Sequence, residues 1–263
     1  MQTSRRPSRW VSFPRARRVG RVRLFCFPHA GGSAAIYCFW SRQFPEDIEV
    51  CPVNLPGRGA RLEESPCSRL LELAGAVTRE LTPFLDVPFA LFGHSMGALL
   101  SFEIARELER REVPAPLCLF ASGYRAPQIP PGPPIHHLPK DELLAAVERR
   151  YGAMPDAVIQ SRELMEFVLP VLRADMEMCE TYAYENGQPL SCPIQALGGT
   201  DDSWVGRSHL LPWREQTRAA FTLRMFPGDH FFVQTAEHWV RQTLSADLQR
   251  MVDRDARTDD PRS

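Results

Sequence analysis

The fold is decided by one stretch, which reads Phe89-Ala90-Leu91-Phe92-Gly93-His94-Ser95-Met96-Gly97-Ala98-Leu99-Leu100. Its first apolar residues predict a buried strand, its last continue at helical spacing, and the Gly-His-Ser-Met-Gly between them predicts a sharp turn. A serine on such a turn takes a strained backbone conformation, which Gly93 and Gly97 accommodate because they have no side chain. The turn lifts the Ser95 hydroxyl clear of the sheet, beside the positive end of a helix. We predict that Ser95 is a catalytic nucleophile; a structural Ser-Gly turn is the alternative.

Composition limits the class of protein. The chain has 263 residues, of which 44% are hydrophobic and 24% charged, enough for one large core and one domain. It contains no apolar run of the roughly 20 residues that span a bilayer, and no signal-peptide core near its start. Seven irregularly spaced cysteines leave one unpaired in any full disulfide scheme, which favours reduced thiols. We therefore expect a cytoplasmic monomer that binds neither membrane nor nucleic acid.

Arginine dominates the N-terminal end of the chain. Residues 1–23 contain eight arginines and no acidic residue, so the total charge of −1 leaves about −9 on the other 240 residues. We predict that residues 1–20 form a basic, disordered arm. A transit peptide or a basic contact for an acidic partner is the alternative. At the other end, residues 253–263 are polar and are expected to form a disordered tail.

Strand-length apolar runs alternate with helical patterns over residues 21–252. This alternation predicts an α/β fold, with a mostly parallel central sheet and helices on both faces. Strands are expected at 22–27, 48–53, 89–92, 117–123, 193–199 and 221–226, and helices at 34–42 and 68–85.

The alternation breaks at about residues 125–190. Five prolines within 125–134 exclude a helix or a central strand, and helical patterns follow at about 140–151, 156–160 and 161–186. We predict an inserted helical lid over the carboxyl edge of the sheet. The candidates for its inner face are Met154, Phe167, Leu172, Met176, Met178, Tyr182 and Tyr184. Their helical spacing favours ordinary core, and a flexible lining for an acyl chain is the alternative.

Two backbone amides are candidates for an oxyanion hole. The first strand runs into Pro28-His29-Ala30-Gly31-Gly32, a glycine-rich loop of the kind that supplies one donor in serine hydrolases. The other donor comes from the residue after the nucleophile, so we expect the N–H groups of Ala30 and Met96 to hold the oxyanion. A plain glycine-rich turn is the alternative.

An acid and a base follow Ser95 in the chain order that this architecture requires. His230 lies on a loop after the last expected strand and is the predicted general base. Asp201 and Asp202 both follow the preceding strand; the spacing from Gly199 favours Asp202, whereas Gly198 gives Asp201 the same spacing. Asp202 is therefore the predicted third member and Asp201 the alternative.

Other polar residues receive structural interpretations. His29, His136, His137, His209 and His238 are expected to be structural. Arg58 and Arg61 lie in a turn-rich loop and are expected to be solvated, with contact to an anionic group at the pocket rim as the alternative.

Several segments together resemble the type II (external, editing) thioesterases of polyketide and non-ribosomal peptide synthase systems. These segments span residues 22–235: Phe25-Cys26-Phe27-Pro28-His29-Ala30-Gly31-Gly32, Leu55-Pro56-Gly57-Arg58, Gly93-His94-Ser95-Met96-Gly97, Leu172-Arg173-Ala174-Asp175, Cys192-Pro193-Ile194 and Pro227-Gly228-Asp229-His230-Phe231-Phe232. The chain departs from the family in its arginine arm and at Asp229, where the family often has glycine.

The resemblance implies an α/β-hydrolase fold with a helical lid. It implies hydrolysis of acyl groups from the phosphopantetheine arm of acyl- or peptidyl-carrier proteins, with Ser95, His230 and an acid at Asp202 or Asp201, and with no cofactor or metal. Two other functions stay open on the residues alone: a carboxylesterase or lipase acting on oxygen esters, and a non-catalytic binding protein with a hydrolase fold.

Overall fold

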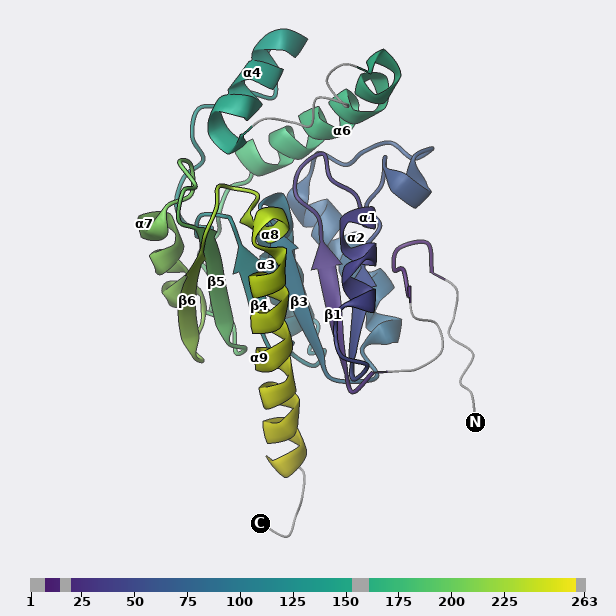
Figure 1. The fold of residues 1–263 in the computed structure, drawn as a ribbon, viewed down its shortest axis with the longest axis vertical. Coiled ribbons are helices and arrows are strands. Elements are labelled where there is room, and N and C mark those ends of the chain that lie inside the picture. Colours follow the sequence, from purple (N-terminus) through teal and green to yellow (C-terminus); the bar gives the residue numbers. More distant parts are fainter. Residues whose placement is uncertain (1–7, 15–19, 153–160, 259–263) are drawn as a thin grey trace.

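Six parallel strands form the central sheet, in the order β2-β1-β3-β4-β5-β6 (Figure 1). The computed structural model describes residues 8–14, 20–152 and 161–258. The strands are β1 (Val22–Phe27), β2 (Ile48–Pro52), β3 (Phe89–His94), β4 (Leu119–Ser122), β5 (Ile194–Gly199) and β6 (Phe221–Phe226). The predicted α/β class and the position of each expected strand are confirmed.

Helices cover both faces of the sheet. One face carries α2 (Leu70–Leu81), α3 (Met96–Arg110) and α7 (Arg207–Leu210); the other carries α1 (Ala35–Cys38), α8 (Phe232–Thr235) and α9 (Glu237–Thr258). Short 3-10 helices occupy Trp40–Arg42, Gly59–Arg61, Thr82–Phe84 and Leu211–Gln216. Because both faces are covered, strands such as β1 and β3 are buried along their whole length, which explains their continuous apolar runs.

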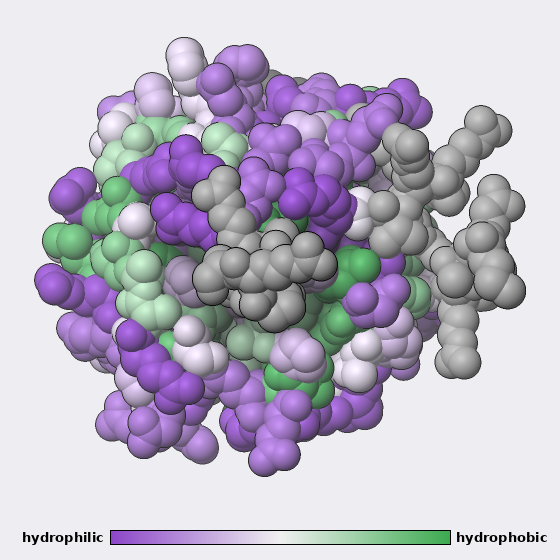
Figure 2. All heavy atoms as spheres, turned by 90° about the horizontal axis from the view of Figure 1, so that it is seen from below, coloured by the Kyte–Doolittle hydropathy of each residue, from purple (hydrophilic) through white to green (hydrophobic). Residues whose placement is uncertain are grey.

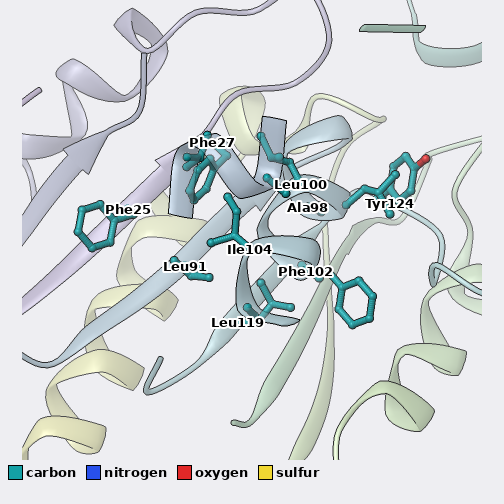
Figure 3. Close-up of a cluster of buried hydrophobic side chains, with 14 of the residues drawn as sticks. Phe25, Phe27, Leu91, Ala98, Leu100, Phe102, Ile104, Leu119 and Tyr124 are labelled. Carbon is teal, nitrogen blue, oxygen red and sulfur yellow. The ribbon is translucent and has the colours of Figure 1, made fainter. Parts of the chain in front are cut away.

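The packing of α3 on the sheet fixes the geometry around Ser95. Figure 3 shows side chains of α3, such as Ile104 and Phe102, close to Leu91 of β3 and Leu119 of β4. The start of α3 approaches the strands so closely that a Cβ atom on Gly97 would lie 2.3 Å from the Phe27 carbonyl oxygen. This position therefore requires glycine.

Where the structure describes the segment between β4 and β5, it carries the inserted helices α4 (Lys140–Tyr151) and α6 (Arg162–Glu180). Figure 1 shows both helices beyond the edge of the sheet to which the strands point. The helix expected at 140–151 matches α4, and the one expected at 156–160 lies outside the described residues. The helix expected to reach 186 ends at Glu180, and the two tyrosines that follow bond elsewhere: the Tyr182 hydroxyl to Glu103 and the Tyr184 hydroxyl to Gln216.

The inserted helices have a small core of their own. Leu172 and Met176 of α6 pack with Leu143 and Val147 of α4. Phe167, expected on the inner face, is instead 56% exposed. Of the other candidates, Met178 is buried in the main core, Tyr182 and Tyr184 pack against it, and Met154 lies outside the described residues.

The described ends of the chain depart from the expected arm and tail. Val11 is buried and forms an antiparallel bridge with Val53, so residues 8–14 are packed within a segment expected to be a free arm. Trp10 helps to hold this segment, because the Arg61 guanidinium lies 3.5 Å above its ring centre. At the other end, α9 continues to Thr258, past the expected boundary at 252.

The end of the molecule opposite the inserted helices is largely hydrophilic, with apolar side chains in small groups (Figure 2). Among the helices of the described residues, none is both long and apolar enough to cross a membrane.

Candidate active site

Ser95 sits on a strained turn between β3 and α3. Its φ and ψ are 54° and −123°, and it is one of two non-glycine residues with positive φ in the described chain. Strain of this kind persists only where neighbouring structure holds it, and here the Ser95 N–H donates to the Ser122 carbonyl oxygen over 2.7 Å. A Cβ atom on Gly93 would lie 2.0 Å from the Gly97 carbonyl oxygen, so both flanking glycines are required for the turn. The local sequence therefore fixes where the Ser95 hydroxyl points.

The Ser95 hydroxyl is the first member of a chain of hydrogen bonds. Its Oγ atom lies 3.0 Å from Nε2 of His230, and Nδ1 of the same ring lies 2.7 Å from Oδ2 of Asp202. An ionised carboxylate can only accept, so Nδ1 carries the proton and Nε2 presents a lone pair to the Ser95 O–H. All three side chains are buried, which strengthens these interactions relative to water.

Asp202 is held as a carboxylate by three donors. Its Oδ1 atom accepts hydrogen bonds from the N–H groups of Trp204 and Val205, each over 2.9 Å, and Oδ2 faces His230. Burial alone would raise the pKa of Asp202, but the bond from His230 and the two backbone donors outweigh it, so its pKa is lowered. Asp201, the alternative acid, is exposed, and within the described residues its carboxylate accepts a hydrogen bond only from the Thr200 hydroxyl.

The other histidines do not join this chain of hydrogen bonds. Nδ1 of His94 bonds to the Ser122 hydroxyl, and His136 bonds to Glu180. Burial lowers the pKa of His94 well below its usual value and also lowers that of His29. Both rings are therefore held neutral.

The two amides predicted to form an oxyanion hole lie beside Ser95. Ala30 and Met96 both line a pocket with Ser95, and within the described residues no hydrogen bond occupies either N–H. The Ala30 N–H points away from Gly32, because the carbonyl of the same peptide, that of His29, accepts the Gly32 N–H over 2.9 Å. The Met96 N–H is the first of α3, at the positive end of that helix.

The pocket lies between the sheet edge and the inserted helices. Its cavity volume is about 20 Å³, room for about one water molecule, within about 380 Å³ of empty space that includes open solvent. Its walls come from Tyr124, Tyr151 and Trp204, with Met176 and Cys179 on α6. The ring centre of Tyr151 lies 4.8 Å from that of His230, so the end of α4 covers the histidine. Burial raises the pKa of Tyr151 to about 12, which keeps its hydroxyl neutral. Sequence patterns gave no signal for Tyr151 or Trp204.

Arg58 and Arg61 are buried, not solvated as expected. Arg58 forms a two-bond ion pair with Asp175 of α6, and Arg61 pairs with Glu64. A buried guanidinium needs a carboxylate partner, and Asp175 is 117 positions away, beyond the reach of local pattern. In the sequence, Arg58 and Asp175 stand out only because each ends a segment that resembles the type II thioesterases.

The position of the site follows from the sheet order. β1 leads to β2 on one side, whereas β3 lies on the other, so the loops after β1 and β3 diverge and leave a crevice at the carboxyl edge. The serine, histidine and aspartate lie at this edge. Within the described residues, no three His, Cys, Asp or Glu side chains gather in a way that could hold a metal ion.

The strand order, the strained serine turn and the adjacent histidine and aspartate define the α/β-hydrolase class. Comparison with known proteins narrows the class. The family model described as "Thioesterase domain" matches residues 22–247. The chain belongs to this thioesterase family, and it is a hydrolase.

Individual relatives agree with this assignment. Gramicidin S biosynthesis protein GrsT of Aneurinibacillus migulanus is 42% identical over 245 residues, which are 93% of this chain and 96% of that protein. The RedJ thioesterase of the prodiginine pathway in Streptomyces coelicolor superposes with a TM-score of 0.82 at 37% identity, covering 86% of this chain and 90% of its own. The type II thioesterase BorB of the borrelidin biosynthetic cluster gives a TM-score of 0.81 at 33% identity, covering 93% and 98%. The resemblance to type II thioesterases is confirmed.

Proposed function

We propose that this chain hydrolyses acyl thioesters from the phosphopantetheine arm of acyl- or peptidyl-carrier proteins, and so removes stalled or aberrant acyl groups from a polyketide or non-ribosomal peptide synthase. One observation carries the chemistry: Ser95, His230 and Asp202 form an unbroken chain of hydrogen bonds. Beside them lie the N–H groups of Ala30 and Met96, which have no hydrogen-bond partner among the described residues. The relatives named for peptide and polyketide pathways support the substrate class.

In the first step the Ser95 oxygen attacks the thioester carbonyl carbon while its proton moves to Nε2 of His230. The negative charge that develops on the carbonyl oxygen is stabilised by the N–H groups of Ala30 and Met96, each donor worth about 10²–10³ in rate. Asp202 orients the ring and stabilises its positive form. The carbon–sulfur bond then breaks, His230 returns the proton to the leaving sulfur, and an acyl-serine remains.

In the second step a water molecule attacks the acyl-serine carbonyl. His230 takes a proton from the water, the same two amides hold the oxyanion, and the bond to the Ser95 oxygen breaks. The proton passes to Ser95, and the carboxylic acid leaves. The pocket walls of Tyr151, Trp204 and Met176 provide apolar surface for the acyl group.

We propose a cytoplasmic setting for the reaction. Carrier proteins are the macromolecular partners, without nucleic acid or membrane, and the protein acts in the cytoplasm as a monomer. The seven cysteines are all free, which suits a reducing compartment.

A comparison of substrates tests the proposal. We would measure kcat/KM for a hexanoyl thioester on a carrier protein, for hexanoyl pantetheine, and for an oxygen ester of the same acyl chain. We expect the carrier-bound thioester to be preferred by at least about tenfold, because the carrier adds contacts that the small substrates lack. Preference for the oxygen ester would make the protein a carboxylesterase. Absence of turnover and of labelling by a fluorophosphonate probe would make it a binding protein.

A further inference from the structure

We infer that Asp175 of helix α6, with Arg58 as its counter-ion, is a positioning residue that holds the Ala30 amide in place as an oxyanion donor. This inference rests on the proposed function, because it concerns a donor of that reaction. It extends the site to a side chain of the inserted helices that touches neither Ser95 nor His230.

The contact begins at Gly31, the residue after Ala30. The Gly31 N–H donates to Oδ2 of Asp175 over 2.8 Å. The carbonyl of the same peptide unit, that of Ala30, accepts a hydrogen bond from Nδ1 of His29 over 2.9 Å. Both ends of the Ala30–Gly31 peptide are therefore fixed, one by α6 and one by the loop itself.

The neighbouring peptide unit contains the proposed donor. Its carbonyl, that of His29, is held by the Gly32 N–H, and its own N–H, that of Ala30, is left to face the pocket. Gly31 has a φ of +73°. Because glycine adopts many other conformations equally well, the loop needs contacts from outside to stay in this one. Asp175 supplies such a contact to the peptide that follows the donor.

Arg58 fixes Asp175 in turn. Its two terminal nitrogens lie 2.5 Å and 2.8 Å from the two carboxylate oxygens, and Asp175 is fully buried. Arg58 also reaches the Gly32 carbonyl oxygen over 3.5 Å, so one guanidinium contacts both α6 and the loop. Planar two-bond pairing sets the direction of the carboxylate as well as its charge.

Stability alone does not account for this pair. A buried ion pair is usually no more stable than apolar side chains of the same volume, because both charges must be desolvated. An apolar pair, however, could not accept the Gly31 N–H. Asp175 supplies an acceptor for the Gly31 N–H and, at the same time, two oxygens for the terminal nitrogens of Arg58.

The test uses the whole chain with Asp175→Asn, and Glu49→Gln as a matched control. Glu49 also pairs with a buried arginine, Arg23, but at the far end of β1 and β2. For each variant we would measure the thermal midpoint, kcat and KM for hexanoyl pantetheine, and Ki for an alkyl boronic acid, which forms a tetrahedral adduct with the serine. We expect Asp175→Asn to lower kcat by about tenfold or more with KM within threefold, and to raise the boronate Ki by a similar factor. Glu49→Gln should lower only the thermal midpoint.

A second variant covers the case in which Asp175→Asn does not fold. Arg58→Lys keeps the positive charge but loses the planar fork, so we expect a folded protein with kcat lowered severalfold and the boronate Ki raised to match. A folded Asp175→Asn or Arg58→Lys with kcat within twofold of wild type would overturn the inference, as would an equal loss of kcat in Glu49→Gln. Wild type inactive on every thioester would instead overturn the proposed function.

Discussion

The Nε2 atom of His230 lies 3.0 Å from the Oγ atom of Ser95, although 135 positions separate the two residues in the chain. Ser95 follows β3, whereas His230 follows β6 at the edge of the sheet. The loop after β6 therefore reaches back across the carboxyl ends of β5 and β4. The contact between Ser95 and His230 depends on the whole sheet. Each variant of the site must therefore be shown to be folded before its activity is compared with that of wild type.

Variants of the two neighbouring aspartates, Asp201 and Asp202, test which of them is the acid that pairs with His230. We expect Asp202→Asn to lower kcat by about 10⁴, because an amide at this position allows the wrong tautomer of His230 and cannot stabilise its positive form. Asp201→Asn should keep activity within about twofold, since the Asp201 carboxylate is exposed and, among the described residues, accepts a hydrogen bond only from Thr200. Steady-state kinetics on one acyl thioester would check both variants. The reverse order of effects would assign the acid to Asp201.

A substitution at Gly97, two residues after Ser95, tests how closely α3 packs on the strands. In Gly97→Ala the new Cβ atom would lie 2.3 Å from the Phe27 carbonyl oxygen, so we expect a loss of stability of more than about 4 kcal/mol or failure to fold. Gly75→Ala in α2 is the matched control: its Cβ would have only the end of Arg79 within 4 Å, and we expect a gain of up to about 1 kcal/mol. Urea unfolding followed by circular dichroism would measure both. Equal stability of the two variants would show that α3 can move away from the strands.

Because His94 is buried, we expect the free energy of unfolding to fall in acid. Burial lowers its pKa well below the ordinary value, so below about pH 6.5 the unfolded chain takes up a proton that the folded chain excludes. The free energy of unfolding should therefore fall with falling pH, by up to about 1.4 kcal/mol per unit from this one side chain. His29, whose pKa is also lowered by burial, adds a change of the same sign. Asp202 adds its own loss only at lower pH, near and below about 4, because its carboxyl has a lowered pKa.

The variant His94→Gln separates this effect from general acid unfolding. Urea unfolding at pH 7.5, 6.5 and 5.5 should give a shallower fall in the variant than in wild type, even where the variant is less stable throughout. The same slope in both proteins would contradict the assignment to His94.

Local patterns were sufficient to predict the sheet and the serine turn. The strands around Ser95 are buried on both faces, so their apolar runs are continuous, and Gly93 and Gly97 mark the turn directly. The order of the acid and base along the chain also followed from the architecture. Spacing could not separate Asp201 from Asp202, because adjacent residues satisfy the same distance from one or the other of two glycines.

Long-range contacts account for what local patterns missed. The sequence around Arg58 predicts a solvated loop residue, because it does not show that α6 places Asp175 against the guanidinium. Residues 8–14 read as part of a basic arm, because the sequence does not show that Val11 can bridge to Val53. Tyr151, at the end of an ordinary amphipathic helix, reaches His230 only through the way that helix is placed over the sheet.

Hydrolysis of a carrier-bound acyl thioester by Ser95→Ala shows whether Ser95 is the nucleophile. We expect a folded protein, with a circular dichroism spectrum like that of wild type, whose kcat is lowered by at least about 10⁴. Turnover within tenfold of wild type by the folded variant would contradict the claim that Ser95 is the nucleophile.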